Sequence, residues 1–109
     1  MILLSMKTKD ENLIAVKSKD FAIRTIGLYK FLCDENGNHI IGNQILRSGT
    51  SIGANVKEVI RGQAKADFGT KMNIALKEAS ETEYWLELLR DTDIVQKLRL
   101  RVCLRIVWN

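Results

Sequence analysis

The spacing of apolar residues between positions 68 and 89 constrains the fold more than any other feature of this sequence. Residues follow one another there at intervals of four and three, namely Phe68, Met72, Ala75, Ala79, Thr82, Leu86 and Leu89. This rhythm places them on one side of an α-helix and is typical of a coiled-coil seam. Asp67 precedes the seam and is a residue type favoured at the N-cap. We therefore expect a long helix that starts at Asp67 and packs against other helices.

Two earlier segments have the same helical period. Residues 17–34 contain two parallel stripes, one of Ala22, Ile26, Tyr29 and Cys33 and one of Phe21, Thr25, Leu28 and Leu32. Residues 43–63 repeat Ile45, Gly49, Ile52, Val56, Val59 and Gln63. Such broad faces predict helices that contact several neighbours. The chain has no proline, the residue that breaks helix interiors, so long helices are permitted throughout.

Small residues set the second segment apart. Gly49, Gly53 and Gly62 lie within it, and each glycine in a helix interior costs about 1 kcal/mol relative to alanine. Together with Ser48, Ser51 and Ala54 they form a face with little side-chain bulk, which lets another helix come close. A break of the helix near residues 49–51 is the alternative that the sequence leaves open.

The length of 109 residues indicates one domain. We expect a flexible lead-in at residues 1–16, with Met1 or Met6 as the natural start, and a single helical-bundle domain at residues 17–109. Residues 94–108 could add a short fourth helix, but from Arg99 to Arg105 their apolar residues approach the alternation of a strand. The predicted fold is all-α: an up-down four-helix bundle with a short or atypical fourth helix.

The sequence offers little for catalysis or for metal binding. Its one histidine, His39, follows an Asn-Gly turn, where we expect it to be solvated. Cys33 and Cys103 lie too far apart in sequence for a metal motif and are expected to be reduced thiols. No apolar run approaches the roughly 20 residues that span a bilayer. We therefore expect a cytoplasmic protein that is not an enzyme, with no cofactor, metal, membrane or small-molecule substrate.

Charge is unevenly distributed. The chain has 17 Lys and Arg against 13 Asp and Glu, and four of the cations (Lys97, Arg99, Arg101 and Arg105) lie in the acid-free tail. Without them, residues 1–93 are neutral overall. A second basic group consists of Lys57, Arg61 and Lys65 at intervals of four, with Lys71 as an extension. Both groups are candidates for binding nucleic-acid phosphates; a solvated face is the alternative for the stripe.

Two glutamates lie beside the apolar stripe of residues 68–89. Glu78 and Glu81 flank the apolar positions near Trp85, where they could face another helix. A partly buried carboxylate needs a partner. Arg47, Lys57 or Arg61 of the second segment could supply it, and exposure to solvent is the alternative.

At this point the chain resembles a known family. Residues 41–89 read IGNQILRSGTSIGANVKEVIRGQAKADFGTKMNIALKEASETEYWLELL, and residues 21–32 read FAIRTIGLYKFL. They resemble the bacterial four-helix-bundle family that includes proteins encoded in intervening sequences of large-subunit ribosomal RNA genes; the accessory protein of diversity-generating retroelements is similar. The resemblance covers about residues 20–90. After Arg90 the sequence departs from the family, which continues with a longer fourth helix.

The resemblance implies a ring-shaped homopentamer, association with nucleic acid and no enzymatic activity. Its pattern carries over onto residues that we expect to have structural or assembly roles first and to contact a ligand only second, namely Arg47, Ser48, Asn55, Glu58, Asn73, Glu78, Glu81, Tyr84 and Trp85. Our first hypothesis is an oligomeric bundle that binds RNA or DNA through basic surface residues. The alternative is a protein-interaction scaffold, such as an adaptor for a reverse transcriptase, without nucleic-acid affinity of its own.

Overall fold

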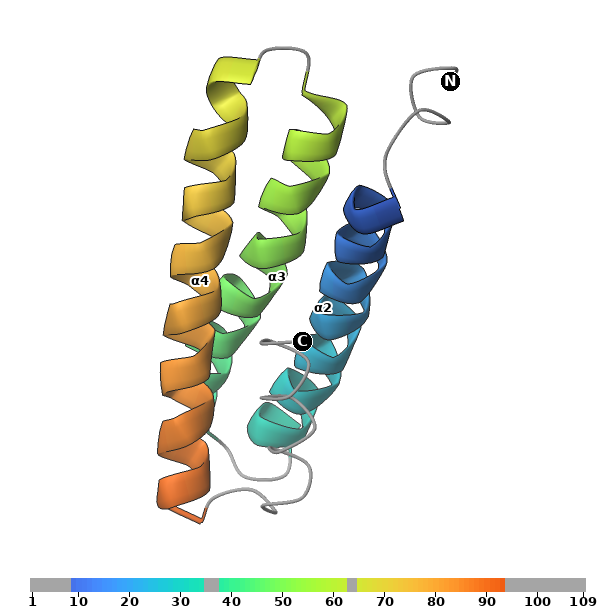
Figure 1. Cartoon of the computed structure of the whole chain (residues 1–109). Coiled ribbons are helices and arrows are strands. Elements are labelled where there is room, and N and C mark those ends of the chain that lie inside the picture. Colours follow the sequence, from blue (N-terminus) through green and yellow to red (C-terminus); the bar gives the residue numbers. More distant parts are fainter. Residues whose placement is uncertain (1–8, 35–37, 63–64, 94–109) are drawn as a thin grey trace.

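Three α-helices make up the part of the chain that the computed structural model describes, which is residues 9–34, 38–62 and 65–93 (Figure 1). Helix α2 spans Lys9–Asp34, α3 spans His39–Arg61 and α4 spans Lys65–Asp91. Successive helices run in opposite directions. Helix α3 packs against both α2 and α4, whose backbones do not come close to each other. The central helix therefore forms one seam with each of its neighbours.

The all-α class agrees with the sequence, but the expected four-helix bundle is wrong, because the described residues form three helices. Residues 94–108, where a fourth helix was expected, lie outside the described residues. They also lack a stripe with helical period, which is the pattern that a bundle helix needs in order to bury one face.

The helix ends differ from those expected. Helix α2 begins at Lys9 rather than Lys17, since neither proline nor glycine interrupts residues 9–16. Helix α4 begins at Lys65, so Asp67 lies inside the helix and is not its N-cap. Helix α3 begins at His39 because the side chain of Asn38 accepts a hydrogen bond of 3.2 Å from the Ile41 N–H.

Helix α3 continues without a break through residues 49–51, which excludes the interrupted helix that the sequence left open. His39 belongs to the first turn of this helix rather than to a loop, and its side chain is exposed.

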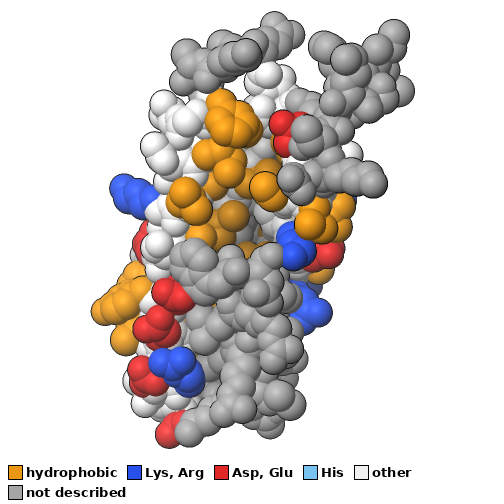
Figure 2. Space-filling model, in the orientation of Figure 1, with side chains coloured by type: hydrophobic (Ala, Val, Ile, Leu, Met, Phe, Trp, Pro, Cys, Tyr) orange, Lys and Arg blue, Asp and Glu red, His pale blue; other side chains and the backbone are white. Residues whose placement is uncertain are grey.

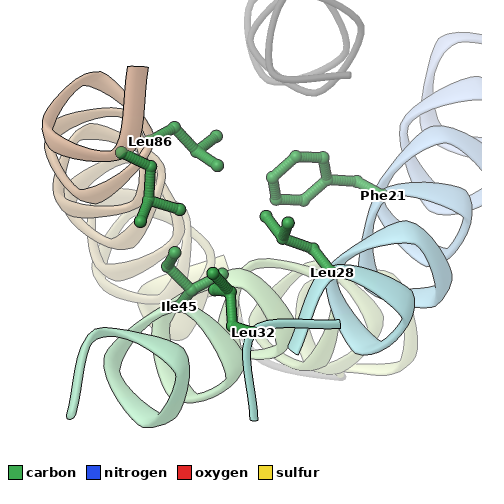
Figure 3. Packing of buried hydrophobic residues seen from close by; sticks show 6 residues of the cluster. Phe21, Leu28, Leu32, Ile45 and Leu86 are labelled. Carbon is green, nitrogen blue, oxygen red and sulfur yellow. The ribbon is translucent and has the colours of Figure 1, made fainter. Parts of the chain in front are cut away.

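Side chains from all three helices meet in one apolar core. Its fully buried members are Phe21, Leu28, Leu32, Ile45, Leu86 and Leu89. Figure 3 shows the labelled members pointing toward one another from α2, α3 and α4. The expected seam of α4 is buried from Ala75 to Leu89, whereas Phe68 at its start is 50% exposed. Of the two stripes on α2, the one that contains Phe21 faces the core.

Helices α2 and α3 approach closely where the sequence has small residues. A Cβ atom on Gly49 would lie 2.7 Å from Thr25 Cγ2, and one on Gly53 would lie 3.3 Å from the Ser18 carbonyl oxygen. Thr25 is buried, and its hydroxyl donates a hydrogen bond of 2.8 Å to the Phe21 carbonyl. Glycine at position 49 is therefore what brings the two helices into contact.

Apolar side chains also reach the surface. Figure 2 shows a group of them in the upper half of one face, with charged side chains mainly to the sides of this group and below it. None of the described helices is both long enough and apolar enough to cross a membrane.

Candidate nucleic-acid interface

A groove between α2 and α3 brings three cations together. Its volume is about 470 Å³, and Lys19 on α2 faces Lys57 and Arg61 on α3 across it. The remaining lining residues are small, apolar or neutral and polar, namely Asn12, Ala15, Ser18, Ala22, Thr50, Gly53, Ala54 and Ile60. Among the described residues that line this groove, none is acidic. Its charge therefore suits an anionic ligand.

The α3 cations of the groove are exposed and have no counter-ion among the described residues. Lys57 and Arg61 lie four residues apart, so their side chains project from the same side of the helix. The ion pairs of the described residues involve other cations. Both side chains can bind an incoming phosphate without first breaking an ion pair to a described residue.

The basic stripe expected from the sequence (Lys57, Arg61, Lys65 and Lys71) does not form one uncompensated basic surface. Lys71 Nζ lies 2.8 Å from Glu58 Oε2, so its charge is compensated by a carboxylate of α3. A second hollow of about 440 Å³ adjoins the groove at Lys57 and Arg61 and includes Glu58. The side chain of Lys65 and all of the tail cations (Lys97, Arg99, Arg101 and Arg105) lie outside the described residues.

The other seam of α3 has an ionic network at its surface. Arg47 donates a hydrogen bond of 3.2 Å to Glu78 Oε2, another to Glu81 Oε1, and two more to the Gln44 side chain. The side chain of Glu78 is 15% exposed, and that of Glu81 is 32% exposed. Of the three cations considered as partners for these glutamates, Arg47 is the one that pairs with them.

The ionic network around Arg47 lowers the pKa of Glu81. The hydrogen bond from Arg47 holds the pKa of Glu81 below its usual value of 4.5, although partial burial opposes this effect. Trp85 contributes as well, since its Nε1 donates a hydrogen bond of 3.3 Å to Glu81 Oε1. The indole packs against the apolar core, and Tyr84 meets it edge-on with ring centroids 5.4 Å apart.

Hydroxyl groups connect α3 and α4 in the interior of the protein. Ser48 and Thr82 are fully buried, and their side-chain oxygens share a hydrogen bond of 2.8 Å. The Thr82 hydroxyl also bonds to the Glu78 carbonyl at 2.7 Å. Asn55 donates to the Ser51 carbonyl of its own helix, and Asn73 is exposed on α4. The residues assigned by resemblance thus cluster mainly along the α3–α4 seam.

Sequence reasoning did not identify Lys19 as a partner of the α3 cations. The period of one helix shows which of its own residues share a face, but Lys19 joins Lys57 and Arg61 only through the packing of α2 on α3. Among the described residues no group of three or more metal-ligating side chains comes together. The groove is therefore the feature whose chemistry most clearly suits a ligand.

Comparisons with known proteins place the chain in a family. The family model described as 23S rRNA-intervening sequence protein matches residues 10–106. A crystal structure from Bacteroides thetaiotaomicron, described as a protein of unknown function from the S23 ribosomal protein family, is 48% identical with a TM-score of 0.86. The alignment covers 89% of this chain and 87% of that one. No curated protein matches. The chain belongs to the 23S rRNA-intervening sequence protein family.

Proposed function

We propose that this protein binds structured RNA through backbone phosphates at the groove between α2 and α3, without catalysing a reaction. The observation that carries the proposal is the convergence of Lys19, Lys57 and Arg61 on a groove whose described lining residues include no acid. The family's name refers to 23S rRNA intervening sequences, which makes ribosomal RNA the first ligand to test.

Binding of this kind is electrostatic. Lys and Arg side chains that contact phosphates release counter-ions, so affinity falls as salt rises, by a log–log slope of about 0.7 per phosphate on a single strand. Phosphate contacts position an RNA but do not read its sequence. We therefore expect binding with strong salt dependence and weak sequence preference.

The test is a titration of a labelled structured RNA at several salt concentrations. The variant Lys57→Gln/Arg61→Gln removes the two α3 cations from the groove. We expect weaker binding at low salt and a slope reduced by about 1.4, which corresponds to two phosphate contacts.

The matched control is Arg24→Gln/Lys77→Gln. It also removes one arginine and one lysine, both exposed and both outside the groove, so the change in net charge is the same. An equal loss of slope in the two variants would show that only net charge matters. Binding by the groove variant with the slope of the unaltered protein would refute the proposal.

A second candidate function is that of a protein-interaction scaffold, which is supported by exposed apolar residues. Val16 and Ile23 are 57% and 58% exposed, and they lie seven residues apart on one side of α2, away from its buried stripe. Such residues suit a protein contact, for instance with an enzyme that acts on nucleic acid, or with further copies of the chain in a ring-shaped homopentamer. The cytoplasmic location likewise stays a prediction.

Assembly is tested by sedimentation of the full chain and of Val16→Lys/Ile23→Lys. If α2 forms the contact, the unaltered chain sediments as an oligomer and the variant as a smaller species. A sedimentation coefficient unchanged by the substitutions would remove this face from the contact.

A further inference from the structure

The groove between α2 and α3 is lined by small apolar residues, which we name its floor, and by cations, which we name its rim. The floor is formed by residues with little or no side chain, namely Ala15, Ala22, Gly53 and Ala54, with Ile60 at one end. The volume of about 470 Å³ falls within the roughly 300–1,000 Å³ of typical ligand pockets. A surface that bound only phosphates would need the cations but not this floor.

The packing of α2 on α3 explains why the groove is hollow. The backbones meet at Gly53, where a Cβ atom would touch the Ser18 carbonyl oxygen. Beside this contact the alanine side chains end after one carbon atom, so they leave space above them that longer side chains would fill. Ala54 of α3 is exposed, and Ala22 of α2 is partly exposed.

Polar groups that line the groove suit a nucleobase. Thr50 Oγ1 donates its proton to the Leu46 carbonyl at 2.6 Å, and Ser18 Oγ donates to the Ala15 carbonyl at 3.2 Å. Both hydroxyl oxygens therefore remain as acceptors only. Asn12 is exposed and adds a carboxamide, which offers a donor and an acceptor together, as the edge of a base requires.

From this arrangement we propose that the groove takes up one unpaired nucleotide of the RNA. The phosphates on its two sides lie on Lys57 and Arg61, one on each, and its base lies over the alanine floor. The complementary charge of the rim selects a phosphate-bearing ligand, and the floor provides the apolar surface on which a base can be buried. Bases inside a duplex are paired and stacked, so only an unpaired one can enter. This inference rests on the RNA binding proposed above.

Filling the floor tests the inference separately from the phosphate contacts. Ala54→Leu places a larger side chain in the groove and leaves every cation in place; Ala22→Leu does the same from the other wall. Ser80→Leu, at an exposed position of α4, is the matched control for an added leucine. The ligands are a single-stranded RNA oligonucleotide, its duplex and the same strand with abasic positions, with folding of each variant checked by circular dichroism.

We expect the filled variants to bind the single strand about tenfold more weakly, because the apolar face of one base is no longer buried. Their salt slope and their affinity for the duplex should stay unchanged, and the abasic strand should bind the unaltered protein as weakly as the single strand binds the filled variants. Unchanged single-strand binding by folded Ala54→Leu and Ala22→Leu would overturn the nucleotide pocket. The slope of Lys57→Gln/Arg61→Gln would still test the phosphate site independently. Absence of RNA binding by the unaltered protein would overturn both.

Discussion

The two seams of α3 are held together by different chemistry. At the α2–α3 seam the contact is steric, because Gly49 lets the helix backbone reach the Thr25 side chain. At the α3–α4 seam polar groups bridge the helices, through Ser48 and Thr82 inside and Arg47 outside. One helix thus uses its glycines on one side and its hydroxyl and guanidinium groups on the other.

This difference bears on function. Along the α3–α4 seam the described cations Arg47 and Lys71 are paired with carboxylates, which compensate their charge. Along the α2–α3 seam Lys57 and Arg61 have no such partners among the described residues, and they border a groove. We infer that one seam mainly sets the arrangement of the helices, whereas the other is available to a ligand.

Substitution of Gly49 should disrupt the close contact between α2 and α3. In Gly49→Ala the new methyl group would clash with the buried Thr25 side chain, whose β-branch leaves it little freedom to move. We expect a net loss of about 2 kcal/mol in the free energy of unfolding, because overpacking outweighs the better helix propensity of alanine. Urea denaturation followed by circular dichroism measures this loss.

Gly27 provides the control for the same substitution. Apart from its own chain neighbours and the adjacent backbone of α2, no atom of the described residues lies within 4 Å of the position that its Cβ would take. Gly27→Ala should therefore stabilise the protein by up to about 1 kcal/mol through helix propensity alone. If both glycine variants were stabilised, the close approach at Gly49 would not be a feature of the protein in solution.

The buried hydroxyl pair should show the polar character of the other seam. Thr82→Val keeps the shape of the side chain but leaves the Ser48 hydroxyl without its interhelical partner, which we expect to cost about 1.5 kcal/mol. Adding Ser48→Ala removes the second hydroxyl, so the double variant should regain part of this loss. A double-mutant cycle in urea measures the coupling, and additive losses would contradict the interaction.

The Arg47 network should contribute less, because it lies at the surface. Arg47→Gln is expected to cost about 0.5–1 kcal/mol at neutral pH, and less in high salt. Arg47 lowers the pKa of Glu81 in the folded state, so this contribution is present above the unfolded-state pKa and is lost as the pH falls through the folded-state pKa.

Thermal unfolding of both proteins between pH 7 and pH 3 measures this dependence. The unaltered protein should lose more stability than Arg47→Gln below about pH 5, so the two curves converge. A gap that is independent of pH would mean that Glu81 does not depend on Arg47 for its charge.

The sequence predicted those features that one helix determines by itself. The period of residues 75–89 predicted the buried face of α4, and the small residues around Gly49 predicted a close helix contact. Features that depend on two helices were predicted only in part. Arg47 was one of three candidate partners for the glutamates, and the pairing of Lys71 with Glu58 was missed, because the geometry of packing decides which charges meet.

The ends of the helices were also predicted poorly. Asp67 has the chemistry of an N-cap, but α4 starts at Lys65, and α2 extends back to Lys9 although residues 9–16 have no clear apolar stripe. The expected fourth helix was inferred from residues 94–108, although their apolar residues do not keep a helical period, and these residues lie outside the described part of the chain. A stripe with helical period therefore predicts the middle of a helix well but not its limits.

NMR mapping of bound RNA on the isotopically labelled full chain tests the difference between the seams most directly. At low salt, a single-stranded RNA should change the amide chemical shifts most at Gly53, Ala54 and Lys57, along the α2–α3 groove. Amides of Glu78 and Glu81 on the α3–α4 seam should change little. The largest changes on the α3–α4 seam, with the groove unaffected, would contradict the account.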